Sequence, residues 1–371
     1  MGPWQPMQAG DPDQCGGFRL THRIGEGGFG TVFLGFRPDI ADPAAVKIFK
    51  PGYGASPVWR SRFLREIDAI KRMAGAHTAA LLDADGNGDP AWLATRYVHA
   101  PPLNTLVGQY GAFDTLCAWW LATGLGEALA EIHAKGILHR DLTPRNILVT
   151  STGVKVIDFG ISRFTDTDGV TTDSSFFGSV DFTANEHLLD PRQATEKSDV
   201  FALGAVLVYV TTGRPPFHQV SAADRLQGAL PNLDGVPDEL YDLVESCLTP
   251  TPAYRPTAMN VFRTALGCLA DFAVPLASDS GLPLPMEIRD FVEQWVASPV
   301  SVPDLVVVSA GGAAADSAAI SIGDATKSQH TDSRHPDNAP PKSAFGDEWR
   351  ARWRSAAARR RDGYGRRPGS M

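Results

Sequence analysis

Short runs of apolar, β-branched and aromatic residues recur through the first hundred positions of the chain. Runs of this kind at 18–24, 31–36 and 44–49 predict three strands. Two more, at 81–82 and 92–95, flank a polar Asp/Gly/Asn stretch that predicts a hairpin turn. Between these groups, over 58–73, the residues Phe63, Ile67 and Ile70 recur at helical spacing and predict one helix.

A helical pattern begins at residue 114 and continues to 135. Asp114 is suited to the N-cap of this helix, and Gly136 to its end. Two short strands are predicted at 147–149 and 154–157, and a further amphipathic helix over 286–296, packed on the body of the domain. The buried side of the long helix is expected to hold Trp119, Trp120, Leu125, Leu129 and Ile132.

The composition changes beyond residue 297. Residues 298–342 are rich in Ala, Gly, Ser, Asp and Pro, which is typical of a disordered linker. The segment 342–371 carries nine Lys or Arg against three Asp or Glu, and Phe345, Trp349 and Trp353 would share one helical face. Such a basic aromatic tail suits an anionic membrane surface or an acidic partner, and a tail that is merely solvated is the alternative.

The remaining composition is that of an ordinary globular protein, with 43% hydrophobic and 20% charged residues among 371. A net charge of −8 does not favour nucleic acid as a partner. The four cysteines lack metal-ligand spacing, and no apolar run is long enough for a transmembrane segment. We therefore expect a cytoplasmic protein, at most peripheral to a membrane through its tail.

The strongest chemical signal is residues 139–146, whose sequence matches H-R-D-L-x-x-x-N at all five fixed letters. In phosphoryl transfer, a carboxylate orients the attacking hydroxyl, and an amide oxygen five residues later reaches a magnesium ion. We therefore expect Asp141 to be the catalytic base and Asn146 a metal ligand. A solvated loop is the alternative, and the partner motifs on both sides argue against it.

A glycine-rich stretch at 25–30 lies between two predicted strands. The pattern G-x-G-x-x-G also occurs in dinucleotide-binding folds, but there a helix follows the glycines. Here β-branched and aromatic residues follow, so a strand–loop–strand lid over phosphates is favoured over a dinucleotide site or an ordinary turn.

Lys47 lies in an apolar strand and keeps, with Ala45, the pattern V-A-I-K. A lysine in such a position needs a partner, and Glu66 lies beside the apolar face of the predicted helix. We predict a Lys47–Glu66 ion pair that directs the ammonium at the α- and β-phosphates. Asp158, at the end of a short strand and followed by Phe-Gly, is predicted to bind magnesium.

Together these motifs resemble the Hanks-type, eukaryotic-like serine/threonine protein kinases of bacteria, over about residues 18–269. The resemblance implies an α+β, bilobal fold with a β-rich N-lobe (18–98) and a helical C-lobe (99–270). A flexible N-terminus (1–17), a helical extension (271–297) and a mostly disordered tail (298–371) would complete the chain. It also implies that Glu186, which ends a substrate-positioning segment at 178–186, pairs with Arg255, and that Asp199 is buried in the C-lobe.

The activity implied is transfer of the ATP γ-phosphoryl group to Ser or Thr hydroxyls of protein substrates, with Mg²⁺ or, as an alternative, Mn²⁺. Asp141, Lys47, Asn146 and Arg145 would form the catalytic set, and Asn146 and Asp158 would bind the metal. The residues expected to surround ATP are Ile24, Gly25, Glu26, Gly27, Gly28, Phe29, Gly30, Val32, Ala45, Lys47, Glu66, Arg96, Val98 and Leu148.

The sequence departs from the family pattern at three positions. Thr143 stands where such kinases usually carry lysine, and Arg145 is the candidate for the missing charge. Asn185 replaces the proline of A-P-E, and Arg96 lies where the connector between lobes often carries an acid. A weakly active kinase or a pseudokinase scaffold that recruits partners through the tail is therefore the alternative function, and a small-molecule kinase is a third.

Regulation by autophosphorylation is a further expectation. An arginine before the catalytic aspartate, here Arg140, commonly binds a phosphate on the activation loop. Thr171 or Thr172 is the favoured acceptor in this chain.

Overall fold

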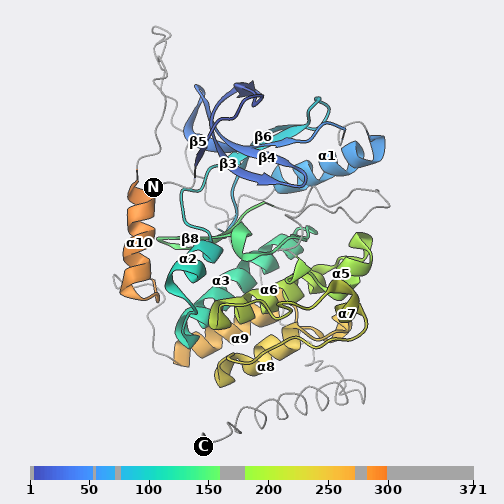
Figure 1. Cartoon of the computed structure of the whole chain (residues 1–371), viewed down its shortest axis with the longest axis vertical. Coiled ribbons are helices and arrows are strands. Elements are labelled where there is room, and N and C mark those ends of the chain that lie inside the picture. The colour runs from blue at the N-terminus through green and yellow to red at the C-terminus, as the bar shows by residue number, and fades with distance from the viewer. Residues whose placement is uncertain (1–3, 53–55, 72–76, 159–179, 272–281, 299–371) are drawn as a thin grey trace, which may run out of the picture. The chain divides into compact units, whose positions relative to one another are not determined.

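The computed structural model describes residues 4–52, 56–71, 77–158, 180–271 and 282–298. A β-sheet with one helix forms the N-lobe, and helices form the C-lobe (Figure 1). This is the bilobal fold that the motifs predicted. The predicted basic tail at 342–371 lies outside the described residues.

The N-lobe sheet is antiparallel, in the order β1-β3-β4-β5-β7-β6, with β2 also paired to β3. The hairpin expected around 83–91 is present, although its first strand extends through Asp85. The elements of this lobe are β1 (Gln5–Pro6), β2 (Gln14–Cys15), β3 (Phe18–Gly27), β4 (Gly30–Arg37), β5 (Ile40–Phe49), α1 (Pro57–Lys71), β6 (Leu81–Asp85) and β7 (Trp92–Arg96).

One face of the sheet carries the small core of the N-lobe. Phe18, Phe33, Val46 and Trp92 are buried there, as the alternation of side chains along paired strands requires. Helix α1 packs at the end of β5, where Phe49 meets Phe63 edge-on with ring centroids 5.2 Å apart. Phe49 alternates along β5 with the core residues Val46 and Ile48, so α1 packs on the opposite face of the sheet.

The described part of the segment before β3 pairs with the sheet. Gln5 pairs with Arg23 and Gln14 with Arg19, both on β3. The Trp4 indole donates a hydrogen bond of 2.9 Å to the hydroxyl of Tyr97. Short strand pairing and the contacts of Trp4 with His22, Tyr97 and His99 thus attach residues 4–15 to the lobe.

The C-lobe is built around α3 and α6, both of which are buried along most of their length. Asp114 caps α3 through a hydrogen bond from the Cys117 backbone, and Gly136 follows the helix at a φ of 71°, as predicted. Trp119 is buried but its neighbour Trp120 is only half-buried, because adjacent residues diverge by about 100° around a helix. The elements of this lobe are α2 (Leu103–Tyr110), α3 (Thr115–Ala134), β8 (Ile147–Thr150), β9 (Gly153–Val156), α5 (Asn185–Leu189), α6 (Glu196–Thr212), α7 (Ala222–Leu226), α8 (Asp238–Cys247) and α9 (Ala258–Asp271).

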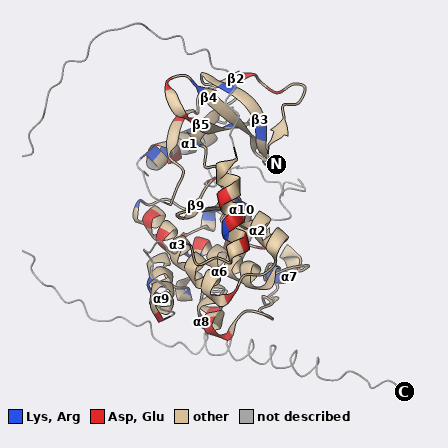
Figure 2. Ribbon diagram, turned by 90° about the vertical axis from the view of Figure 1, so that its left-hand side faces the viewer, with Lys and Arg blue, Asp and Glu red and all other residues tan. Residues whose placement is uncertain are grey.

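Helix α10 (Met286–Ala297) confirms the amphipathic helix predicted at 286–296. It lies beside α2 and β8, with Ile288 and Val292 buried (Figures 1 and 2). Near its end the carbonyl of Trp295 accepts a hydrogen bond of 2.5 Å from His99, in the connector between the lobes. Among the described helices, none is both long and apolar enough to cross a membrane.

Candidate active site

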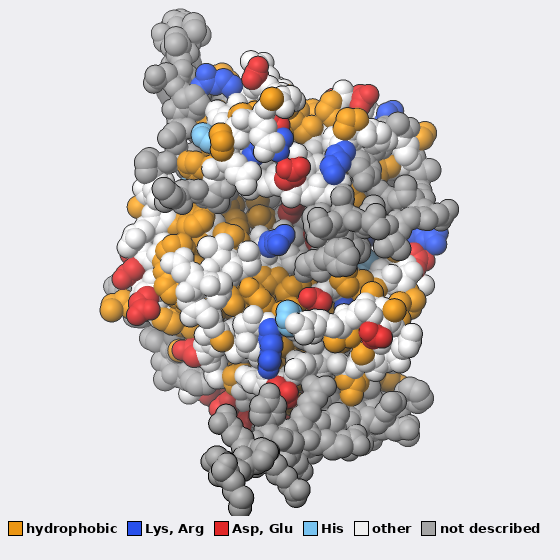
Figure 3. Space-filling view, viewed as in Figure 1, with side chains coloured by type: hydrophobic (Ala, Val, Ile, Leu, Met, Phe, Trp, Pro, Cys, Tyr) orange, Lys and Arg blue, Asp and Glu red, His pale blue; other side chains and the backbone are white. Residues whose placement is uncertain are grey.

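The strand register gathers the predicted nucleotide residues of the N-lobe on one face of the sheet. Val32 lies opposite both Gly25 and Lys47, and Ala45 lies two residues before Lys47 on the same strand. Side chains two apart on a strand share a face, so these residues face away from the N-lobe core. In Figure 3, hydrophobic side chains line the hollow between the two lobes.

The glycine-rich stretch closes the β3–β4 hairpin, in which Gly27 pairs with Gly30. Gly30 is required by its neighbours, because a Cβ there would lie 2.1 Å from the Ile48 carbonyl oxygen. Gly27 has no atom within 4 Å of the equivalent position, so its backbone faces open space. One glycine thus allows close packing on β5, and the other leaves room beside the backbone.

Asn146 connects the two ends of the catalytic loop, residues 139–146, by hydrogen bonds. Its side-chain amide donates to the Asp141 carbonyl at 2.8 Å and lies 3.3 Å from the Asp141 carboxylate. A 3₁₀ turn, Pro144–Asn146, makes this return geometrically feasible. Asp141 and Asn146, identified from their spacing alone, are therefore in contact.

Asp199 on α6 holds the loop from below. Its two carboxylate oxygens accept the backbone N–H groups of His139, at 2.9 Å, and Arg140, at 2.8 Å. His133 of α3 lies 2.8 Å from the same carboxylate. Burial on its own raises the pKa of Asp199, but the hydrogen bond from His133 and the other donors outweigh it and hold that pKa below the ordinary value.

His139 is completely buried, and burial lowers its pKa. Its Nε2 donates to the Ile157 carbonyl at 3.1 Å, and its Nδ1 accepts from the Asp141 backbone N–H. One ring nitrogen donates and the other accepts, which is the pattern of neutral imidazole. His139 therefore joins the catalytic loop to the segment that ends at Asp158.

Two non-glycine residues in this region have left-handed backbone conformations, Arg140 at φ 62° and Asp158 at φ 61°. Such conformations are uncommon and cluster at functional sites, where the surrounding contacts hold them. For Arg140 the restraint is the bond from its N–H to Asp199.

The predicted Lys47–Glu66 ion pair is wrong in this structure. The Lys47 ammonium instead bonds the Asp158 carboxylate at 2.7 Å. The Glu66 carboxylate bonds the Arg140 guanidinium at 2.5 Å, with both side chains about four-fifths buried. Burial raises the pKa of Glu66, and the charge of Arg140 opposes that shift. Sequence spacing placed Glu66 on the correct side of α1, but it could not choose between two cations on different elements.

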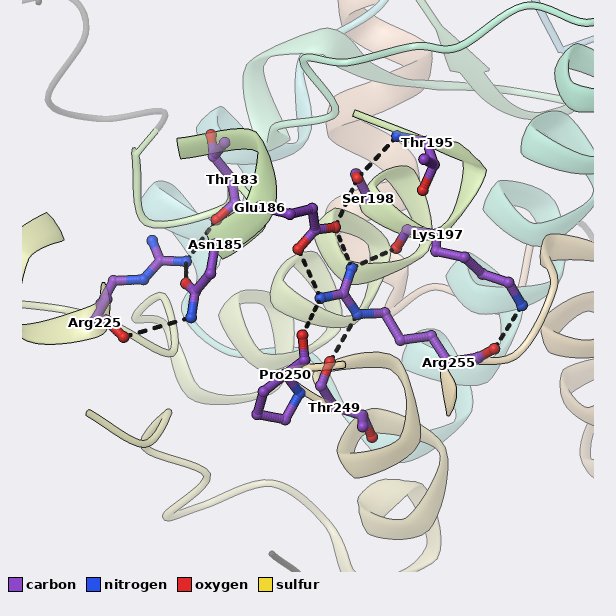
Figure 4. A network of polar contacts seen from close by, with 10 residues as sticks. All are labelled: Thr183, Asn185, Glu186, Thr195, Lys197, Ser198, Arg225, Thr249, Pro250 and Arg255. Carbon is purple, nitrogen blue, oxygen red and sulfur yellow. Dashed lines mark hydrogen bonds and ion pairs between the residues drawn. The ribbon is translucent and has the colours of Figure 1, made fainter. Parts of the chain in front are cut away.

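The predicted pair of Glu186 and Arg255 is confirmed. The guanidinium bonds both carboxylate oxygens, at 2.6 and 3.0 Å, and Ser198 donates to the same carboxylate at 2.7 Å (Figure 4). Arg255 also donates to the carbonyls of Thr249, Lys197 and Pro250. All of its nitrogens thus have acceptors, which offsets the desolvation of a fully buried side chain.

The remaining predicted residues lie partly on the surface and partly in the core. The Arg96 side chain is exposed and lies 3.3 Å from Asp42, on the surface of the N-lobe. Thr143 is buried, whereas Arg145 is exposed and its charge acts on Tyr209 of α6. Leu148 is buried on β8. The phosphorylation candidates Thr171 and Thr172 lie outside the described residues.

Four side chains that organise the site were missed by sequence reasoning: His133, Ser198, Lys197 and Arg225. His133 follows the buried Leu129 by four residues, so a polar residue on the apolar face of the helix was a usable signal. Nothing in the local sequence distinguished Arg225. Its partners lie about 40 residues away along the chain.

The donor set fits a hard divalent cation. Asn146 supplies an amide oxygen and Asp158 a carboxylate, the oxygen ligands that Mg²⁺ prefers. No cluster of three or more His, Cys, Asp or Glu side chains suited to a metal occurs in the part of the chain that the structure describes. A metal ion that is bound mainly by phosphates and water needs only one or two ligands from the protein.

Comparisons with known proteins agree with this geometry. The protein kinase domain model matches residues 18–266. The "Probable serine/threonine-protein kinase PkwA" of Thermomonospora curvata is 41% identical over 260 residues, which cover 69% of this chain and 35% of that protein. The serine/threonine-protein kinase AfsK of Streptomyces coelicolor is 39% identical over 254 residues, covering 68% of this chain and 32% of AfsK. The chain thus spans about a third of the length of these curated relatives.

The fold has solved counterparts. The kinase domain of Mycobacterium tuberculosis PknI superposes with a TM-score of 0.56 at 23% identity, covering 69% of this chain and 96% of that structure. The residues matched by the family model include the glycine-rich hairpin, Lys47, the catalytic loop and Asp158. The chain therefore belongs to the protein kinase family, and it is similar to serine/threonine kinases of bacteria.

Proposed function

We propose that this chain is an ATP-dependent protein kinase that phosphorylates Ser or Thr hydroxyls. The observation that carries the proposal is that side chains of the N-lobe and the C-lobe lie together beside the catalytic loop. Lys47 of the sheet bonds Asp158 at 2.7 Å, next to a catalytic loop in which Asn146 contacts Asp141. A lysine, two carboxylates and an amide are the side chains that phosphoryl transfer uses.

In this mechanism, Asp141 accepts a hydrogen bond from the attacking hydroxyl and then its proton. Asn146 and Asp158 would hold a divalent cation, which would neutralise charge on the phosphates. Lys47 binds the α- and β-phosphate oxygens, and the backbone around Gly25, Gly27 and Gly30 covers them. Arg145 is the candidate cation for the γ-phosphate. Positioning and charge neutralisation then provide most of the rate enhancement.

Glu66 takes a positioning role in this proposal. Its bond to Arg140 ties α1 of the N-lobe to the residue that precedes Asp141. Movement of α1 is thereby coupled to the catalytic loop.

The proposal is tested by incubating the full chain with labelled ATP, Mg²⁺ and a generic basic protein. We expect label on Ser or Thr in the basic protein, in this chain, or in both. Label on tyrosine alone would contradict the assigned specificity. Absence of transfer, in a chain that still binds ATP as judged by thermal shift, would contradict the activity.

We propose a cytoplasmic location for the kinase domain, and that residues 342–371 bind an anionic membrane surface or an acidic protein. The support is the sequence pattern alone, a basic segment with aromatic residues four apart. We expect the full chain to co-sediment with vesicles containing phosphatidylserine, and a chain ending at residue 303 to remain in the supernatant. Equal behaviour of the two chains would exclude membrane binding by the tail. Neutral phosphatidylcholine vesicles are the control.

A further inference from the structure

Arg225 is a fully buried arginine that belongs to none of the motifs described above. It lies on the short helix α7, and its side chain is among the largest of those with no exposure. In the described part of the chain no carboxylate forms a direct ion pair with it, although the charges of Asp181 and Glu186 act on it. Its guanidinium lies over the ring of Phe217, 3.9 Å from the centroid. Burial lowers the pKa of Arg225 to about 10.

The hydrogen bonds of Arg225 converge on one short segment. The guanidinium donates to the carbonyl of Thr183 at 2.5 Å and to the side-chain oxygen of Asn185 at 3.0 Å (Figure 4). It also donates to the carbonyl of Val180 at 2.5 Å. The two carbonyls bracket a turn that is also closed by a bond from the Thr183 N–H to the Val180 carbonyl. A single buried cation thus fixes both ends of this turn.

Burying a cation without a direct ion pair is unfavourable, so its hydrogen bonds and the charges of Asp181 and Glu186 must offset the lost hydration. Charge-assisted hydrogen bonds to carbonyl groups and contact with an aromatic ring do so only while the turn keeps its shape. Arg225 therefore restrains the backbone of residues 180–185 more strongly than a neutral side chain would.

The restrained turn forms part of the catalytic surroundings. Phe182 and Thr183 line the same small pocket as Asp141 and Thr143. Phe182 is fixed on its other side by an edge-on contact with Tyr209 of α6. The position of the turn therefore determines what can lie beside the Asp141 carboxylate.

Asn185 makes this arrangement particular to the chain. The family pattern has proline at this position, and proline could neither accept a bond from Arg225 nor donate one. Here the Asn185 oxygen accepts from the guanidinium, and its amide nitrogen lies 3.5 Å from the Arg225 carbonyl. The side chain of Asn185 thus provides a hydrogen-bond acceptor for the Arg225 guanidinium and a donor for the Arg225 carbonyl.

We propose that Arg225, together with Asn185, is a positioning residue for the protein substrate: it holds residues 180–185 in the shape that receives the polypeptide next to the phosphorylated hydroxyl. This inference rests on the proposed kinase activity. It assigns Arg225 to the binding of the protein substrate and not to the binding of ATP, because all its side-chain bonds go to residues 180–185.

The test compares Arg225→Met and Arg225→Lys with the wild-type full chain, using the basic protein and ATP as separately varied substrates. We expect Arg225→Met to raise the KM for the protein about tenfold, which is the size of effect that loss of a hydrogen bond to a charged group produces. The KM for ATP should stay within about twofold of the wild-type value. Arg225→Lys keeps the charge but not the fork of donors, so an intermediate effect is expected. Arg214→Met, which removes an exposed arginine of the same lobe, is the matched control and should change neither constant.

A purely structural role predicts another result. The variant would then show a reduced fraction of active enzyme, seen as a lower kcat with both KM values unchanged, and this outcome would overturn the proposal. Asn185→Ala should also raise the KM for the protein. In the double variant Arg225→Met/Asn185→Ala the increase should be smaller than the product of the two, because both act on one contact.

If the wild-type chain is inactive, the proposed function is contradicted. The positioning of residues 180–185 by Arg225 is then tested by a second measurement, amide hydrogen exchange. Amide hydrogen exchange at residues 180–185 should then be faster in Arg225→Met than in Arg214→Met, while α3 and α6 exchange equally in both. Unchanged exchange at 180–185 would overturn the inference whether or not the chain is active.

Discussion

Replacing Asp141 with asparagine is expected to lower kcat for phosphoryl transfer by about 10²–10⁴-fold, the effect of losing a general base. The affinity for ATP should stay within about a factor of three of the wild-type value. The amide has the shape of the carboxylate but cannot accept a proton. The loop should keep its fold, because Asn146 also bonds the Asp141 main-chain carbonyl, which the substitution leaves in place.

The measurement is steady-state kinetics with the basic protein, combined with ATP binding by thermal shift. Lys47→Ala is the comparison, because it removes the bond to Asp158 and a cation proposed to contact phosphate. It should weaken ATP binding as well as lower kcat, so the two variants should separate by their affinity for ATP. Phosphoryl transfer at the wild-type rate in Asp141→Asn would exclude Asp141 as the base.

Replacing Arg255 with methionine is expected to lower the free energy of unfolding by about 3–5 kcal/mol, the typical loss when one partner of a buried ion pair is removed. The side chain is fully buried and satisfies the Glu186 carboxylate together with three carbonyls. Methionine fills similar space but leaves all four acceptors without this donor. Urea unfolding of the full chain, followed by far-UV circular dichroism, measures the change.

Two further variants make this result specific. Arg255→Met combined with Glu186→Gln should regain part of the lost stability, because the buried charge is then removed as well. Arg192→Met, at an exposed arginine paired with Asp190, should change stability by less than about 1 kcal/mol. An Arg255→Met variant as stable as wild type would show that the ion pair contributes little to folding.

The same pair has a defined pH dependence. Burial on its own raises the pKa of Glu186, but the bonds from Arg255 and Ser198 prevail and lower it below 4.5. A carboxyl whose pKa is lower in the folded state contributes stability above its unfolded pKa, and that stability is lost as the pH falls through the folded pKa. The stability difference between wild type and Arg255→Met should therefore shrink as the pH falls below about 4.5.

Local spacing along the chain was enough to predict most of the helices and strands and the main motifs. Helices α1, α3 and α10 were predictable because their apolar residues recur at helical intervals, and β3–β5 because β-branched and aromatic residues gather in short runs. Asp141 and Asn146 could be assigned to one site because both lie in one short loop, and the contact between them is seen only in the structure. The Glu186–Arg255 pair came from the family resemblance and not from spacing, since the two residues are 69 positions apart.

Which charges meet between elements depends on how the elements pack, and local patterns do not encode it. Lys47 had Glu66 as its expected partner, and the folded chain gives it Asp158, while Glu66 turns to Arg140. The choice depends on how α1 is placed against the catalytic loop, to within the few ångströms over which an ion pair forms. Arg225 is the clearest case, because its neighbours in sequence give no sign that it is buried. Packing of α7 against residues 180–185 brings its acceptors together, and no local pattern encodes contacts across some 40 residues of chain.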